Sequence, residues 1–247
     1  MYIKIDVDDT VPKWSLIEAL LVLGTIFAID WLLPFHKMKW FSNLSELISP
    51  NNTFLGEIFL SVVIKGAFFF IFIGLIIKLG YHLSWAGVGL RRGQGEGWLT
   101  MGISQGILLF FTVTIVGTII SWFFPIEVEL QNVTEILSTA QNGYERVLCV
   151  LIAAVIAPVS EELYFRGFLY PAVKKIIGKI PAVILTSASF GVLHFDIIRF
   201  IPIMLGGVWL NMLYIRTESL YTSMIAHSVW NFLMVFMLFW AQSAGAV

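Results

Sequence analysis

The stretch VLCVLIAAVIAPVSEELYFRG, residues 147–167, decides the fold of this chain. Its first half is apolar enough to begin a membrane-spanning helix, yet Glu161, Glu162 and Arg166 follow in the same segment. A charged side chain at the centre of a bilayer costs at least about 2.5–3.5 kcal/mol, so such residues are rarely kept there without a function. On a helix, Glu162 and Arg166 share a face, whereas Glu161 is turned about 100° away from Glu162. The pattern predicts a structural ion pair between Glu162 and Arg166 and leaves the Glu161 carboxylate free for chemistry.

The composition of the whole chain is that of a membrane protein. Hydrophobic residues make up 58% and charged residues 13% of its 247 residues, whereas a soluble domain carries about 25% charged residues. At about 20 apolar residues per crossing, the fold class expected is all-α, a polytopic transmembrane helical bundle of about seven spans, within a range of six to eight. We expect a single integral-membrane domain over residues 1–247. The apolar segments are 15–34, 54–80, 98–124, 146–170, 181–195, 200–214 and 220–240.

The distribution of Lys and Arg predicts how the chain is oriented. With a cytoplasmic N-terminus, ten Lys and Arg residues fall in inner segments and three in outer ones, in agreement with the positive-inside rule. In the acidic loop 126–145, the apolar residues Val133, Ile136, Leu137 and Ala140 predict a short amphipathic helix on the outer surface. Short loops and the single cysteine, Cys149, are typical of a prokaryotic plasma-membrane protein. The net charge of −1 gives no sign of nucleic acid as a partner.

A further charged residue, Lys65, lies inside the second predicted span, 54–80. A lysine whose ammonium snorkels toward the interface is the favoured interpretation. Asp30, in the first span, is a conceivable partner for it.

The later spans carry polar residues that face the same region. Measured by helical rise from the cytoplasmic ends of their spans, Glu161 lies about 15 Å deep, His194 about 20 Å, His227 about 10 Å and Asn231 about 16 Å. A single His or Asn in a membrane helix is more often an interhelical hydrogen-bond partner than a catalyst. Four such groups at matched depth favour a functional site. Pro158 predicts a bend that would open a pocket toward the cytoplasm.

In order along the chain, these residues resemble the motifs of a known family. Glu161-Glu162-x-x-x-Arg166, Phe190-x-x-x-His194 and His227-x-x-x-Asn231 are similar to the three motifs of the CPBP family, which comprises CAAX prenyl-protease-like and bacteriocin-processing (Abi) membrane proteins. The matching region is about 146–240, which we expect to be the catalytic core.

The resemblance implies an intramembrane endopeptidase, related to the type II CAAX endopeptidases, with a site open to the cytoplasm. It implies that Glu161 and His194 activate water, while His227 and Asn231 polarise the scissile carbonyl and hold the oxyanion. The partners implied are a peptide or membrane-protein substrate and the lipid bilayer. Because relatives are associated with bacteriocin immunity, a non-proteolytic binding or immunity protein is the alternative.

The residues themselves are compatible with two hydrolytic mechanisms. A desolvated glutamate that activates water needs no cofactor, and neutral His and Asn donors stabilise an oxyanion well in a water-poor pocket. Glu161, His194 and His227 also make up a two-histidine, one-glutamate set of the kind that binds zinc. They come from three helices without the compact His-x-x-x-His spacing that makes zinc motifs predictive. We favour the metal-free mechanism and keep zinc as the alternative.

Overall fold

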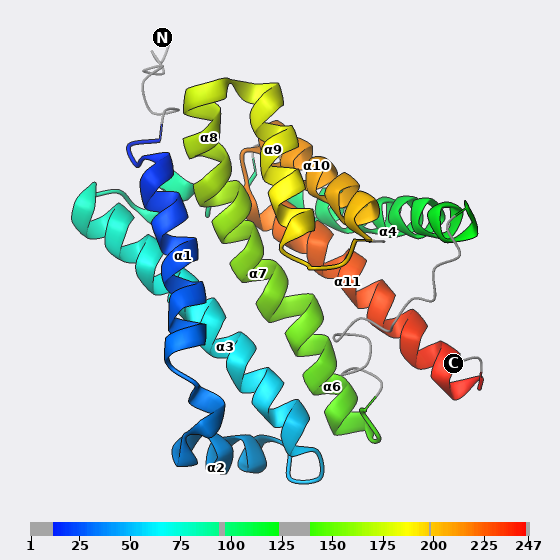
Figure 1. Cartoon of the computed structure of the whole chain (residues 1–247). Coiled ribbons are helices and arrows are strands. Elements are labelled where there is room, and N and C mark those ends of the chain that lie inside the picture. Colours follow the sequence, from blue (N-terminus) through cyan, green and yellow to red (C-terminus); the bar gives the residue numbers. More distant parts are fainter. Residues whose placement is uncertain (1–11, 94–96, 124–138, 198, 246–247) are drawn as a thin grey trace.

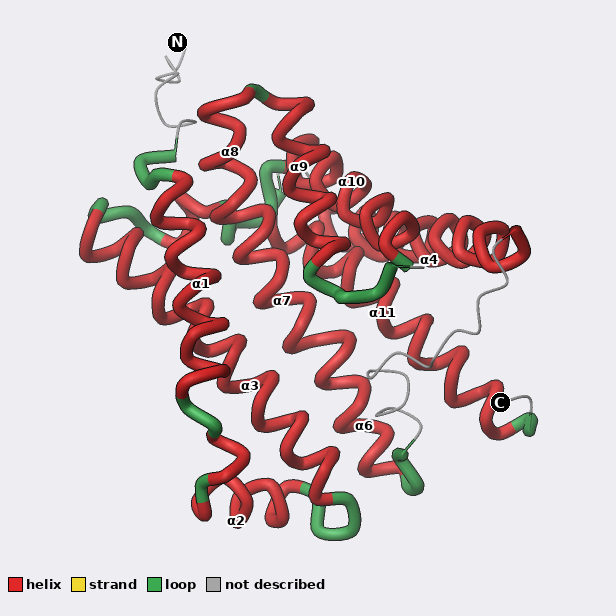
Figure 2. The backbone as a smooth tube through the Cα atoms, in the orientation of Figure 1, coloured by secondary structure: helices red, strands yellow, loops and turns green. Residues whose placement is uncertain are grey.

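The computed structural model describes residues 12–93, 97–123, 139–197 and 199–245, and its regular elements there are all helices (Figures 1 and 2). Six helical segments are long and apolar enough to cross a membrane, and a seventh apolar helix is shorter. This confirms the predicted all-α polytopic bundle. The six are Leu16–Lys37, Thr53–Gly80, Trp98–Phe123, Gly143–Ile177, Phe200–Thr217 and Leu220–Ser243, and the shorter one is Lys179–Val192.

In the labels of Figure 1, most of these segments correspond to a single helix. They are α1 (Leu16–Leu32), α3 (Thr53–Gly74), α4 (Trp98–Phe123), α9 (Lys179–Val192), α10 (Phe200–Thr217) and α11 (Leu220–Ser243). A π-helical stretch, Leu75–Gly80, extends α3.

The segment Gly143–Ile177 is one continuous helix whose α-helical hydrogen-bond pattern is interrupted twice. It contains α6 (Gly143–Leu151), α7 (Ala157–Glu162) and α8 (Tyr170–Ile177), with π-helical stretches at Ile152–Ile156 and Leu163–Leu169. The first π-helical stretch ends two residues before Pro158. The sequence predicts a bend at this proline because proline lacks a backbone donor. Wide turns of this kind are frequent at functional sites.

One end of the bundle collects the short connections and most of the basic residues. Lys174 and Lys175 lie in the last turn of α8 and Arg216 in the last turn of α10. At this end Arg91 forms an ion pair with Glu218, with 2.8 Å between Nη2 and Oε2. We call it the basic end; the start of α1 and the turn between α8 and α9 lie there (Figure 1). The expected orientation corresponds to a cytoplasmic basic end.

The opposite end contains an element that was not predicted. A helix, α2 (Lys39–Ile48), follows the first span and buries Phe41 and Ser45. Its exposed apolar residues Trp40, Leu44 and Leu47 have the i, i+4, i+7 spacing of a helix that rests on a bilayer surface. The amphipathic helix predicted in the loop 126–145 falls largely outside the described residues, which leave out 124–138.

Helices α4 and α11 pack closely because glycine faces the partner. A Cβ atom at Gly106 would lie 2.6 Å from the carbonyl oxygen of Ala226, and one at Gly102 would lie 2.8 Å from Ile225 Cγ2. Both distances are shorter than a real carbon atom tolerates, so the small-residue spacing Gly102-x-x-x-Gly106 is what allows this contact.

The first span is attached directly to the helix that carries the two glutamates. Trp14 donates from Nε1 to the carbonyl oxygen of Phe168 at 2.8 Å, and their rings stack at 5.0 Å. Tyr164 donates from its hydroxyl to the Ala19 carbonyl oxygen at 3.1 Å. The N-terminal span therefore helps to hold the helix on which the site is built.

Candidate active site

Glu162 and Arg166 form a buried ion pair beneath the site. Both side chains are fully buried, and 2.7 Å separates Arg166 Nη1 from Glu162 Oε1. The expected ion pair is present, and Arg166 also donates from Nη2 to the Gly207 carbonyl oxygen on α10 at 3.2 Å. Two buried charges are tolerated only when each is paired and hydrogen-bonded. The pair therefore fixes α7 and the π-helical stretch that follows against α10.

Glu161 has a different environment from its neighbour. Its side chain is 28% exposed, and its Oε2 lies 3.8 Å from His227 Nε2. This distance is too long for a direct hydrogen bond. Of the two glutamates, Glu161 is thus the one that is accessible and not committed to the arginine, which is the separation that the sequence predicts.

His227 connects the two glutamates. It is 2% exposed, and its Nδ1 lies 2.9 Å from Glu162 Oε1 while Nε2 faces Glu161. An ionised carboxylate can only accept a hydrogen bond, so Nδ1 carries the proton in that contact. Its ring also stacks on Trp230, with 5.4 Å between the centroids. Orientation and tautomer of His227 are therefore set by Glu162 and Trp230, and Nε2 is presented to Glu161.

Phe190 lies between the two histidines. Its ring centroid is 4.7 Å from that of His194 and 5.8 Å from that of His227. The Arg166 guanidinium stands over the same ring at 4.7 Å, a cation–π contact. The phenylalanine of the second motif thus brings the three motifs together on one buried side chain.

His194 is placed in the turn just after α9 and is more open than the other site residues. Its Nδ1 lies 2.7 Å from the Phe190 carbonyl oxygen. Because a carbonyl only accepts, the proton is on Nδ1 and the Nε2 lone pair is free to accept one. In the described part of the chain, His194 and Glu161 form no hydrogen bond or ion pair with each other.

Asn231 lies one helical turn beyond His227 on α11 and is partly buried. It donates from Nδ2 to the carbonyl oxygen of Ala153 at 2.8 Å. Ala153 belongs to the π-helical stretch before Pro158. The amide is thereby held beside the same helix as Glu161.

The zinc alternative can be compared with this geometry. Within the described residues, no three His, Cys, Asp or Glu side chains gather closely enough to hold a metal ion. Glu161 and His227 are neighbours, but His194 is not grouped with them. As arranged here, the residues do not form the three-ligand set.

Sequence comparisons agree with the geometry. Residues 143–233 match the family model of the type II CAAX prenyl endopeptidase Rce1-like proteins, and this range contains all three motifs. This part of the chain is therefore similar to the CAAX-protease-like proteins. The chain is also 27% identical over 127 residues to the Bacillus subtilis (strain 168) protein named "Putative membrane peptidase YdiL". That alignment covers 51% of this chain and 51% of the relative, so the chain matches about half the length of that relative. No solved structure matches it.

Two features of the site were not evident from the sequence. The hydrogen bond of His227 to Glu162 joins residues 65 positions apart. The spacing of residues within one helix does not predict such a contact. The π-helical stretches on both sides of α7 also have no simple sequence signal apart from Pro158. The π-helical stretches flank the helix that carries Glu161, and the ring of His227 lies beside its carboxylate.

Proposed function

We propose that this protein is an intramembrane endopeptidase in which Glu161 activates water for attack on a peptide bond. The observation that carries the proposal is the unequal environment of two adjacent carboxylates. Glu162 is buried and hydrogen-bonded to Arg166 and His227, whereas Glu161 is accessible and faces an imidazole nitrogen. A general base must be reachable by the reacting water, and of the pair Glu161 is the accessible one.

In the proposed reaction, a water molecule beside Glu161 attacks the scissile carbonyl carbon and gives one proton to the Glu161 carboxylate. The carbonyl oxygen becomes the oxyanion of a tetrahedral intermediate. When the C–N bond breaks, the leaving nitrogen takes the proton from Glu161, which restores the carboxylate. The products are a carboxylic acid and an amine, and atoms and charges balance without a cofactor.

The oxyanion needs hydrogen-bond donors, and the arrangement of His227 limits how it can act as one. Its Nδ1 proton is directed at Glu162, so Nε2 donates to an oxyanion only when the ring is an imidazolium. Two carboxylates beside the ring, with one guanidinium, make that form electrostatically balanced. Asn231 has a second amide proton besides the one directed at Ala153. We assign oxyanion stabilisation to His227 as imidazolium and to Asn231.

His194 is assigned a role as a second acceptor of the water protons. Its free Nε2 lone pair, set by the bond from Nδ1 to the Phe190 carbonyl oxygen, fits this role. The ring shares Phe190 with His227, so it lies on the same side of the bundle. We further propose that the site opens at the basic end, that this end is cytoplasmic, and that the membrane is a prokaryotic plasma membrane.

The decisive experiment compares cells that carry the wild-type protein, Glu161→Gln and Glu46→Gln. Glu46 is exposed on α2, away from the site, so Glu46→Gln is a matched control for loss of one carboxylate. New protein N-termini in the membrane fraction are then identified by mass spectrometry. Cleavage sites should occur with the wild type and Glu46→Gln and disappear with Glu161→Gln. If no cleavage site depends on Glu161 while all three proteins are folded, the protein is not a glutamate peptidase.

The non-proteolytic alternative predicts another result in the same strains. A binding or immunity protein needs its surface but no general base. Any protective phenotype of the wild type would then persist in Glu161→Gln. Loss of the phenotype together with cleavage supports the peptidase.

A further inference from the structure

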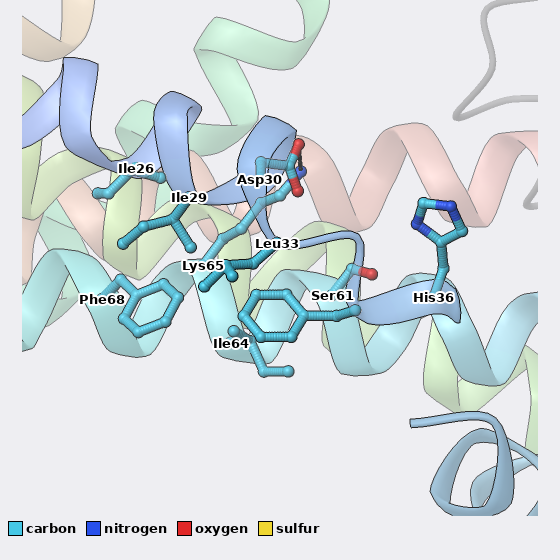
Figure 3. A pocket seen from close by; sticks show the side chains of 10 residues that line it. Ile26, Ile29, Asp30, Leu33, His36, Ser61, Ile64, Lys65 and Phe68 are labelled. Atoms are coloured by element: carbon cyan, nitrogen blue, oxygen red, sulfur yellow. Dashed lines mark ion pairs between the residues drawn. The ribbon is translucent and has the colours of Figure 1, made fainter. Parts of the chain in front are cut away.

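A second polar site, built from residues other than the catalytic ones, lies in a groove between α1 and α3. The groove is lined by residues of both helices, among them Ile26, Asp30, Lys65 and Phe68. In Figure 3, the Asp30 and Lys65 side chains meet above it, Phe68 lies at one end and His36 at the other. The 3.0 Å between Lys65 Nζ and Asp30 Oδ2 makes them an ion pair, so Lys65 has the partner that the sequence made conceivable. Both residues lie outside the range 143–233 that matches the family model.

The ion pair lies at membrane depth, in the half of the bundle away from the basic end. Tyr81 donates to Glu18 at 2.9 Å near the basic end, which gives a common reference for both helices. By helical rise, Asp30 is about 18 Å from Glu18, and Lys65 is about 24 Å from Tyr81. Since a hydrocarbon core is about 30 Å thick, the pair lies below the interface on the α2 side.

The pair is also open to the surroundings of the bundle. The Lys65 side chain is 45% exposed and the Asp30 side chain 50% exposed. Charged groups facing acyl chains are costly, and in membrane proteins they are usually turned to a protein interior or a water-filled cavity. A polar occupant of the groove would remove most of this cost.

The chemistry of the groove selects the occupant. Most of its lining is apolar, and on the basic-end side of the ion pair it includes Ile26, Ile29 and Phe68. Lys65 has three N–H donors, of which one is directed at Asp30. The Asp30 carboxylate can accept further hydrogen bonds besides the one from Lys65. The site thus offers a cation, an anion and an apolar channel beside them.

We propose that this groove binds a phospholipid with a primary-ammonium headgroup, such as phosphatidylethanolamine, from the leaflet on the α2 side. The lipid phosphate accepts from Lys65, the ammonium donates to Asp30, and one acyl chain lies along the apolar channel. An anionic lipid without an amine would bring its charge next to the Asp30 carboxylate. A choline headgroup has no N–H to donate.

The headgroup preference can be measured by native mass spectrometry of the whole protein in an equimolar mixture of phosphatidylethanolamine, phosphatidylglycerol and phosphatidylcholine. The wild type should retain phosphatidylethanolamine about tenfold over the other two, a ratio that corresponds to about 1.4 kcal/mol. Equal retention of the three lipids would overturn the proposal.

Single substitutions distinguish lipid binding by the ion pair from a purely structural role in joining α1 to α3. Asp30→Asn removes the anion and leaves Lys65, so the preference should change to phosphatidylglycerol. Lys65→Met should abolish the preference altogether. Lys78→Met, on the same helical segment but near the basic end, is the control and should behave as the wild type. An unchanged headgroup preference in Asp30→Asn and Lys65→Met would show that the ion pair only holds α1 and α3 together and does not bind lipid.

The alternative is that a second copy of the chain packs on the groove. The same native mass spectra test for such a dimer. A dimer that dissociates in Lys65→Met while lipid retention is unaffected would contradict lipid binding. None of these readouts depends on peptide cleavage. The lipid proposal and the proposed peptidase activity therefore fail independently.

Discussion

His227 is hydrogen-bonded through Nδ1 to Glu162, at 2.9 Å, and this bond orients the histidine of the third motif. Glu162 therefore has two tasks, because the same oxygen atom, Oε1, also contacts Arg166 at 2.7 Å. The second glutamate of the pair both neutralises the buried guanidinium and positions the ring that faces Glu161. Loss of Glu162 is thus expected to affect stability and catalysis through separate contacts.

Glu162→Gln should destabilise the protein by about 3–5 kcal/mol, since it leaves a buried guanidinium without its counter-ion. The double variant Glu162→Leu/Arg166→Met removes both charges and should recover most of that loss. Its cleavage activity should still be low because His227 no longer has an acceptor at Nδ1. Thermal unfolding in detergent and cleavage are measured on the same preparations. Full activity in the double variant would show that Glu162 does not position His227.

Gly106→Ala should destabilise the bundle by about 1–3 kcal/mol, the usual cost of adding a methyl group to a tight contact. The new Cβ would lie 2.6 Å from the Ala226 carbonyl oxygen, so α4 and α11 would have to separate. Gly24→Ala is the matched control, because a Cβ at Gly24 has no atom within 4 Å. The midpoints of thermal unfolding are compared. A drop of equal size in both variants would mean that close packing at Gly106 is not the cause.

Chelation should leave cleavage intact. If Glu161 acts as a general base without metal, the purified protein treated exhaustively with a chelator keeps its activity, and elemental analysis finds much less than one zinc per chain. The assay uses a substrate identified through the Glu161→Gln comparison. Stoichiometric zinc that is lost together with activity and restored with it would establish the metal mechanism instead.

The number and limits of the spans could be predicted because they depend on composition and length alone. The predicted segment 98–124, for example, differs by one residue from α4 (Trp98–Phe123). The pair formed by Glu162 and Arg166 was predictable for a similar reason, since residues four apart on a helix are neighbours. These features need no knowledge of how the helices pack.

Contacts between distant helices could not be predicted in this way. Depth estimates place His227 and Glu161 in the same slab of the membrane, but they do not say which atom of which glutamate the ring faces. Likewise, the sequence made Asp30 no more than a conceivable partner of Lys65, because the pairing depends on how α1 rotates against α3. The helix α2 was missed because its ten residues are too few to be noticed among longer apolar segments.

The short helix α9 has a consequence for the bilayer itself. Its 14 residues rise about 21 Å, which is about 9 Å less than the hydrocarbon thickness. The turn that follows carries Asp196 and Arg199, joined by an ion pair of 3.7 Å, along with His194. A polar turn at this depth draws headgroups and water inward, so we expect the membrane to be dimpled beside α9. The bilayer beside α9 would therefore be thinned from the side opposite the basic end.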